Sequence, residues 1–257
     1  MPRPGGRRSI PLRRTTLWWS GRTGRLLLER AASFVPAWLE KLRPETVLQV
    51  GQPLLWSKPP ESKAIWVLLN EGSVCVNTAY LQILGNGENL PFAAMRFDLV
   101  ILPFCLSRVS DPAAVLAECR RVLRPEGHVL VLDFNPSGSL GMLRRWHVWR
   151  RDRSWPWRRP FLSLGQLRRL LDQEDLMIRE GRYFQYTLPG LGRNAQWLEL
   201  VGDRWWPAGA NAYMLLAQRR DAEQPLVGLV EPAFRERRRR KLRAQAPAAQ
   251  RLRDDDA

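Results

Sequence analysis

A strand–helix–strand pattern in the middle of the chain constrains the fold most strongly. Two apolar runs, Leu99–Leu102 and Val129–Leu132, flank an amphipathic stretch that begins at Asp111. Asp111 is a good helix cap, and Pro112 suits the first helical position. Apolar residues then recur three and four positions apart until residues 125–127, Pro-Glu-Gly, end the helix and turn the chain. Such apolar strands are typical of a sheet covered on both faces, so the pattern predicts a right-handed crossover between parallel strands.

The rest of the chain predicts further elements of one layered fold. We expect helices and strands in this order: a helix from about Gly24 to Leu42, strands at Thr46–Val50, Ala64–Leu69 and Tyr80–Leu84, a helix at Leu162–Asp172 capped by Ser163, and an antiparallel pair at Leu176–Tyr186 and Ala212–Gln218. The alternation of strand and helix predicts a doubly wound α/β sheet in three layers, α/β/α, with an antiparallel C-terminal edge strand.

The connections around the first three strands are unusual. Residues 52–63 contain three prolines, and only residues 70–79 separate the second strand from the third. A parallel crossover normally needs about a dozen residues or more. We therefore expect the helices here to be reduced, with a locally antiparallel pairing as the alternative.

Composition bounds the domain organisation. The chain has 257 residues, of which 45% are hydrophobic, enough for one sizeable core. We expect a disordered basic N-terminus at 1–15, one domain at 16–220, and a disordered tail at 221–257 whose basic run precedes an acidic end. No apolar run is long enough to span a membrane, and no secretory signal is evident. Cys75, Cys105 and Cys119 form neither a disulfide framework nor a metal motif, which suits a reducing cytoplasm.

The net charge of +16 favours polyanionic partners, either nucleic acid or an anionic lipid surface. The alternative is an arginine-rich chain whose charges are simply solvated. Residues 144–160 interleave tryptophan and arginine, which is typical of a patch that stacks on bases or lies at a lipid interface. The alternative for this segment is a short helix that Trp146 and Trp149 anchor on the core.

The central segment also resembles a known family. Leu90-Pro91-Phe92, four residues, Phe97-Asp98-Leu99-Val100, and a helix ending in Leu-Arg-Pro-x-Gly are similar to class I S-adenosylmethionine-dependent methyltransferases of the methyltransferase type 11 kind. Residues 134–141, Phe-Asn-Pro-Ser-Gly-Ser-Leu-Gly, match a small bacterial group with a degenerate first motif. The resemblance covers residues 16 to about 220. It implies a Rossmann-like methyltransferase sheet, S-adenosylmethionine as cofactor, and methyl transfer to an acceptor that the sequence does not identify.

The resemblance implies a cofactor loop after the first strand. The family pattern there is Val-Leu-Glu-x-Gly-x-Gly-x-Gly, whereas this chain reads Val-Leu-Gln-Val-Gly-Gln-Pro-Leu-Leu from Val47 to Leu55. Gly51 is retained, Gln49 replaces the acid, and Pro53 removes an N–H. This loop is either remodelled for the cofactor or has lost it.

By the same resemblance, Glu71 is the candidate for the ribose hydroxyls, with a plain loop carboxylate as the alternative. Asn86 and Gly87 follow the third strand on the adenine side, where Asn-Gly equally indicates a simple turn. Leu90 belongs to a packing wall near adenine. Asp98 is expected to have a structural role at the start of its strand.

The family's methyl-transfer region lies at the end of the fourth strand, so Pro103 is a cofactor candidate and Phe104 a substrate-rim candidate. Asn135, after the fifth strand, is a second rim candidate or else a cap for the next helix. No catalytic residue and no metal ligand is identified, and His128 and His147 are not expected to act as bases. Two functions follow: a methyltransferase, or a catalytically inactive relative whose basic surface binds nucleic acid or anionic membrane.

Overall fold

The computed structural model of the protein describes residues 12–51, 53–56, 58, 60, 63–70, 80–152, 156, 159–186 and 209–220. The chain divides into two units, Met1–Arg220 and Asp221–Ala257, and all described elements belong to the first. The expectations for residues 1–11, Glu71, Cys75 and the tail lie outside the described residues.

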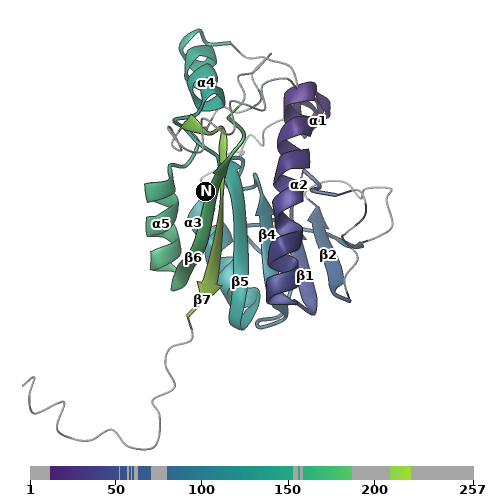
Figure 1. The fold of residues 1–257 in the computed structure, drawn as a ribbon. Coiled ribbons are helices and arrows are strands. Elements are labelled where there is room, and N and C mark those ends of the chain that lie inside the picture. Colours follow the sequence, from purple (N-terminus) through teal and green to yellow (C-terminus); the bar gives the residue numbers. More distant parts are fainter. Residues whose placement is uncertain are drawn as a thin grey trace, which may run out of the picture. The chain divides into compact units, whose positions relative to one another are not determined.

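Among the described elements, two helices precede four successive strands, and helices and strands are interspersed only after them (Figure 1). In chain order the elements are α1 (Leu12–Ser20), α2 (Arg22–Leu42), β1 (Thr46–Val50), β2 (Ile65–Asn70), β3 (Leu81–Leu84), β4 (Phe97–Pro103), α3 (Pro112–Val122), β5 (Leu123–Phe134), α4 (Ser139–Trp149), α5 (Leu164–Gln173), β6 (Leu176–Phe184) and β7 (Ala212–Arg219).

The described strands form one seven-stranded sheet in the order β3-β2-β1-β4-β5-β7-β6. Strands β1 to β5 pair in parallel, whereas β7 is antiparallel to both β5 and β6. The doubly wound α/β prediction with an antiparallel C-terminal edge is therefore confirmed. The strand order reverses between β1 and β4, and ligands of open α/β sheets bind at the carboxyl edge beside such a reversal.

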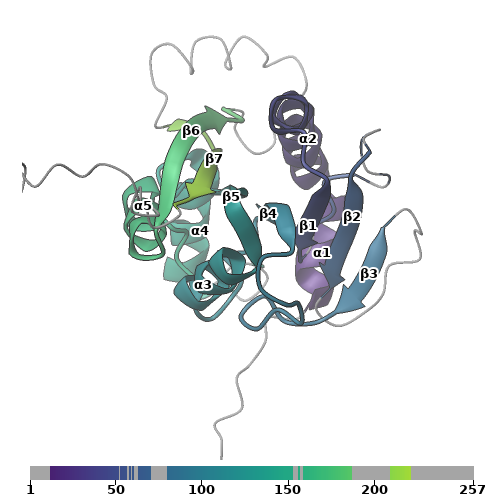
Figure 2. The same ribbon diagram turned by 90° about the horizontal axis from the view of Figure 1, so that it is seen from below.

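Two hydrophobic clusters lie on opposite faces of the sheet. α2 buries Leu27, Ala31, Val35 and Leu39 on one face, and α3 and α5 bury apolar residues on the other (Figure 2). Cys119 of α3 is fully buried, as expected for a small hydrophobe, and this burial raises the pKa of its thiol. The three-layer arrangement leaves the strand ends as the place for a site.

The start of α3 follows the sequence prediction, but its end does not. The Asp111 carboxylate accepts the N–H groups of Ala113 and Ala114 at 3.0 and 3.2 Å. The helix ends at Val122, and β5 begins at Leu123 rather than at residue 129. Residues 124–127 form a bulge in β5. Phe97 of β4 pairs with Leu123, but Leu99, two residues later, pairs with residue 128, so the residues between have no partner on β4. The predicted turn is therefore an irregularity at the start of the strand.

The N-terminal boundary also differs from the expectation. α1 begins at Leu12, inside the segment 1–15 for which we expected no order. Trp19 explains why this helix forms. Its indole is buried, and the centre of its ring lies 4.9 Å from the ring centre of Phe104 and 5.8 Å from that of Phe134. An aromatic anchor of this size stabilises a short helix that would be marginal alone.

The segment after β1 replaces a crossover helix with apolar packing. Leu55 is buried, and the ring of Trp56 lies 5.8 Å from that of Trp66. The Tyr80 hydroxyl donates to the Trp56 carbonyl at 3.2 Å. The described residues between β1 and β2 include no helix, as expected.

The antiparallel alternative for β2 and β3 is wrong, because the two strands pair in parallel from Val67↔Leu81 to Asn70↔Leu84. Chain length explains how a short connection suffices. The ten residues after Asn70 reach about 33 Å when extended, whereas the strands they must pass are no longer than about 20 Å. The connection between β2 and β3 is therefore long enough to return to the amino edge of the sheet without a helix.

Candidate functional site

Gly51 marks the carboxyl end of β1. Its φ of 78° lies in the left-handed region, which favours glycine. Its N–H donates to the Leu69 carbonyl at 2.8 Å, which ties the end of β1 to β2. Among the described residues, a Cβ built on Gly51 would have one neighbour within 4 Å, the Cys105 sulfur at 3.8 Å. As far as the described residues show, the glycine therefore leaves open space beside the main chain at the point where the strand order reverses.

Gln49 closes the loop that follows Gly51. Its side chain is fully buried, and its amide nitrogen donates to the Pro53 carbonyl at 3.2 Å and more weakly to the Gly51 carbonyl at 3.5 Å. Its Oε1 is buried and accepts no hydrogen bond within the described part of the chain. A neutral acceptor thus occupies the position where the resembled family has a carboxylate.

Asn70 ends β2, and the sequence interpretation missed it in favour of Glu71, which lies outside the described residues. Asn70 is almost completely buried and donates from its amide to Gln82 on β3 at 3.2 Å. The signal was present in the sequence, because a polar residue closes the otherwise apolar run of β2. Its main-chain carbonyl accepts the N–H of Gly85, which fixes the start of the next loop.

The turn after β3 is held by its own side chains and by α3. The oxygen of the exposed Asn86 side chain accepts the N–H of Glu88 at 3.0 Å, as in an Asx turn. Gly87 is buried. The Glu88 carboxylate accepts the N–H groups of Ser110 and Asp111 at 2.9 and 3.0 Å. Asn86 thus forms the turn that was the alternative to a ligand role.

An ion pair on α3 fixes the expected wall at Leu90. The Glu118 carboxylate accepts the Leu90 N–H at 2.8 Å, and Arg121 donates to the carbonyls of Leu90 and Phe92 at 2.9 and 2.7 Å. The two side chains also pair with each other, and this bond from Arg121 lowers the pKa of Glu118. Leu90 is buried in the core, so the wall is rigid.

Pro103 and Phe104 lie at the end of β4. Pro103 is buried and pairs with Leu132 of β5. Phe104 has a φ of 53°, and its N–H donates to the Leu132 carbonyl at 2.7 Å. The assignment of Phe104 to a substrate rim needs correction, because its ring is fully buried against Trp19 and Phe134.

The sequence interpretation missed a buried polar pair, Ser107 in the loop after β4 and Asp133 on β5. The Ser107 hydroxyl donates to Asp133 Oδ1 at 2.5 Å, and the same oxygen accepts the Phe134 N–H. Asp133 Oδ2 has no partner within the described residues. Burial raises the pKa of Asp133 from 3.8 to about 7. The signal was an aspartate that interrupts the apolar run of β5.

Asn135 acts within the motif at 134–141 rather than at a rim. Its amide donates to the Ala210 carbonyl at 2.9 Å, and its oxygen accepts the Ser137 N–H at 3.1 Å. Its exposed fraction is 6%. The structure therefore places Asn135 neither at an exposed rim nor as the cap of α4, because its side-chain oxygen accepts an N–H group that precedes the helix.

Asn211 completes the same junction from 70 residues away in the chain. Its side-chain oxygen accepts the Leu140 N–H at 2.9 Å and the Ser139 hydroxyl at 2.8 Å, and so caps α4. A Cβ on Gly138 would lie 2.3 Å from the Ala210 carbonyl oxygen, and one on Gly141 would lie 2.3 Å from that of Pro136. Both glycines are required by close backbone contacts.

A charged pocket of about 390 Å³ lies at the other end of the strands. Asp98 and Arg124, which line it, form an ion pair at 2.9 Å. Asp98 also accepts the Thr46 N–H at 2.9 Å, which confirms its structural role at the strand start. His128 lines the pocket as well, and burial lowers the pKa of its imidazole. This pocket is at the amino edge and is not a cofactor site by the switch-point rule.

Comparison with known proteins agrees with this geometry. Residues 69–131 match the family model described as a methyltransferase domain. The ubiquinone/menaquinone biosynthesis C-methyltransferases UbiE of Vibrio vulnificus and Vibrio cholerae are 39% and 40% identical over 67 residues, 26% of this chain and 25% of theirs. The chain thus matches about a quarter of the length of these curated relatives.

Solved structures match over a much longer part of the chain. A methyltransferase in complex with the Haloferax volcanii activator Trm112 gives a TM-score of 0.55 at 15% identity, covering 80% of this chain and 97% of that one. A Thermotoga maritima methyltransferase gives 0.53 at 16%, covering 81% and 96%. At this identity they show the fold. Residues 69–131 are thus similar to a methyltransferase domain, and the fold is the one shared by these solved methyltransferase structures.

Proposed function

We propose that the protein transfers a methyl group from S-adenosylmethionine to an acceptor at the carboxyl edge of the sheet. Gly51 is the observation that carries this proposal. Its left-handed backbone and the open space beside it lie at the end of β1, where the strand order reverses. A glycine in this conformation allows a ligand to approach the main chain closely.

The described residues fit the cofactor at two further positions. The buried Oε1 of Gln49 lacks a partner among them, and an oxygen at this position would accept an N–H from the cofactor's ammonium group. The wall at Leu90, with the turn at Asn86 and Gly87, provides the adenine side, and Glu71 remains our candidate for the ribose. When bound, S-adenosylmethionine supplies an electrophilic methyl group on sulfur.

The chain's own contribution to the reaction is mainly positional. Methyl transfer to a good nucleophile depends on proximity and in-line alignment. We assign Pro103 and Cys105, at the end of β4, to the methyl-transfer side, because Cys105 faces Gly51. Asp133 and Ser107 are positioning residues, since their buried hydrogen bond fixes the loop that carries Cys105.

Trp56, which follows β1, packs away from the carboxyl edge. Trp56 packs against Trp66, the second residue of β2, four residues before the strand ends at Asn70. Four strand residues span about 13 Å. Trp56 therefore packs nearer the amino ends of the strands than their carboxyl edge, and this position supports a retained site.

A second candidate function is a catalytically inactive member of the family whose basic surface binds a polyanion. The observation that favours it is the amide of Gln49, which donates to loop carbonyls where the family has an acid. A neutral oxygen attracts an ammonium group less strongly than a carboxylate does. In both candidates we place the protein in the cytoplasm, in keeping with the buried thiol of Cys119.

Methyl transfer from radiolabelled S-adenosylmethionine distinguishes the two candidates. Because the matched relatives are C-methyltransferases of ubiquinone and menaquinone biosynthesis, quinol precursors are the first acceptors to test, followed by total lipid and total RNA. We expect S-adenosylhomocysteine and labelled product with the natural chain and with Gly165→Ala, but not with Gly51→Val. Cofactor binding with no product from any of these pools would favour the inactive candidate.

A further inference from the structure

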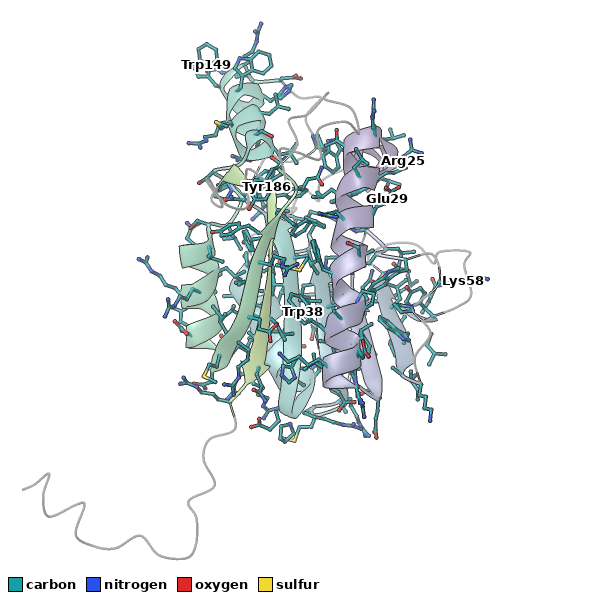
Figure 3. The ribbon with its side chains drawn as sticks, in the orientation of Figure 1. Arg25, Glu29, Trp38, Lys58, Trp149 and Tyr186 are labelled. Atoms are coloured by element: carbon teal, nitrogen blue, oxygen red, sulfur yellow. The ribbon has the colours of Figure 1, made fainter. Side chains whose placement is uncertain are left out.

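α4 presents an apolar stripe away from the core. Met142, Trp146 and Trp149 are spaced four and three residues apart, so they share one face of the helix. Their exposed fractions are 48%, 46% and 79%. Trp149 extends from the end of the helix (Figure 3). The prediction that Trp146 and Trp149 anchor α4 on the core is therefore wrong.

The opposite face of α4 holds the helix on the sheet. Leu140, Gly141 and Arg144 are buried, and the Arg144 guanidinium lies 5.5 Å from the centre of the Phe161 ring. The Asn211 cap and the close contact of Gly138 also fix the start of α4. The rotation of the helix is therefore fixed, and its apolar stripe points away from the sheet.

This stripe lies among positive charges, and the acid nearest to it in sequence, Asp152, contacts the His147 ring at 2.8 Å. Residues 134–151 contain four arginines and neither aspartate nor glutamate. Arg145, Arg150 and Arg151 are exposed, and the Arg150 guanidinium lies 4.7 Å from the centre of the Trp146 ring. β3 also exposes apolar residues, Leu81 and Leu84, but contains no arginine. α1 contains two arginines and exposes Leu17, whereas α4 exposes two tryptophans and a methionine beside its arginines.

We propose that α4 is an interfacial helix that docks the carboxyl edge of the sheet on an anionic lipid bilayer. Tryptophan beside arginine is typical of the headgroup region, where the ring is half-buried and the cation pairs with lipid phosphate. Met142 favours acyl chains over nucleic acid, because an apolar, unbranched side chain neither stacks on bases nor pairs with phosphate.

The position of α4 gives the docking a consequence for the site. The helix begins five residues after β5 ends and stands at the end of the molecule where the parallel strands terminate (Figure 1). That is the edge at which Gly51 and Cys105 lie. Docking would therefore bring this edge to the membrane surface, from which an amphiphilic acceptor could enter. None of the described helices itself has the length and apolar character that a membrane span requires.

Vesicle sedimentation of the full chain tests this inference. We expect the protein to bind vesicles that contain phosphatidylglycerol far better than vesicles of pure phosphatidylcholine, since each arginine near an anionic surface adds roughly fivefold in affinity. Trp146→Ser with Trp149→Ser should weaken binding by about tenfold or more, because two large apolar rings leave the interface. The matched control is Leu81→Ser with Leu84→Ser, two comparably exposed residues on β3, which should bind as the natural chain does.

Two results would overturn the inference. One is unchanged vesicle binding by the tryptophan variant, which would assign binding to charge elsewhere in the chain. The other is tryptophan-dependent binding to an RNA oligonucleotide without vesicle binding. Trp149→Ser alone provides the same test if the double variant does not fold. Vesicle binding is measured without cofactor, so its failure is separate from a failure of methyl transfer.

Discussion

Replacement of Gly138 by alanine tests the account of the junction between β5 and α4. The new Cβ would lie 2.3 Å from the Ala210 carbonyl oxygen and 2.8 Å from the Asn211 Cα. Carbon and oxygen atoms rarely approach closer than about 3.3 Å, so the backbone must move by roughly 1 Å. Overpacking of this kind costs about 1–3 kcal/mol, and displacement of the Asn211 cap adds about 1 kcal/mol. We expect a loss of about 2–4 kcal/mol in the free energy of unfolding.

Urea and thermal unfolding followed by circular dichroism measure this loss. For a domain of about 200 residues, it corresponds to a fall of roughly 4–16 °C in Tm. Gly165→Ala is the control, because a Cβ there meets nothing within 4 Å and alanine favours α5 by up to about 1 kcal/mol. If Gly138→Ala were as stable as Gly165→Ala, the close contact and the role assigned to this motif would be refuted.

Two further substitutions test the polar contacts of the site. Because the unfolded chain ionises Asp133 near pH 3.8 while the folded chain keeps the proton to about pH 7, the free energy of unfolding should fall by up to about 4 kcal/mol between these values and then level off. Asp133→Asn should remove this fall in urea titrations at pH 5 and pH 8, and an unchanged pH dependence would contradict the burial argument. Arg121→Ala removes the hydrogen bonds to the carbonyls of Leu90 and Phe92. Calorimetry should then show cofactor binding about tenfold weaker, while the free energy of unfolding falls by only about 1 kcal/mol. Unaltered affinity would separate this wall from the cofactor.

Local signals made the central part of the fold predictable. Asp111 followed by Pro112 defines a helix start whose capping bonds involve residues two and three positions away. The capping box of α5 is similar, since Ser163 and Gln166 bond to each other's backbone. Strands β2 and β4 were recognisable because nearly every residue in them is apolar. Each of these features depends on neighbours within one element.

The features that could not be predicted depend on contacts between distant residues. Asn211 caps α4 across about 70 residues of chain, so no local pattern reports it. Trp146 and Trp149 are as apolar as core residues, yet α4 is rotated so that Arg144 packs inward on Phe161. A long arginine stem can cover apolar surface, which periodicity alone does not register. Asp133 could not be predicted for the same reason, because its hydrogen-bond partner Ser107 follows a different strand, β4.

Calorimetric titration with S-adenosylmethionine tests the central claim most directly. We expect saturable binding at one site per chain, retained in Gly165→Ala and lost in Gly51→Val, because a side chain at Gly51 would strain the left-handed backbone and occupy the open space beside it. A thermal scan of Gly51→Val confirms that the variant is folded. Absence of both heat and any Tm shift with millimolar S-adenosylmethionine or S-adenosylhomocysteine, on the folded natural chain, would contradict a retained cofactor site.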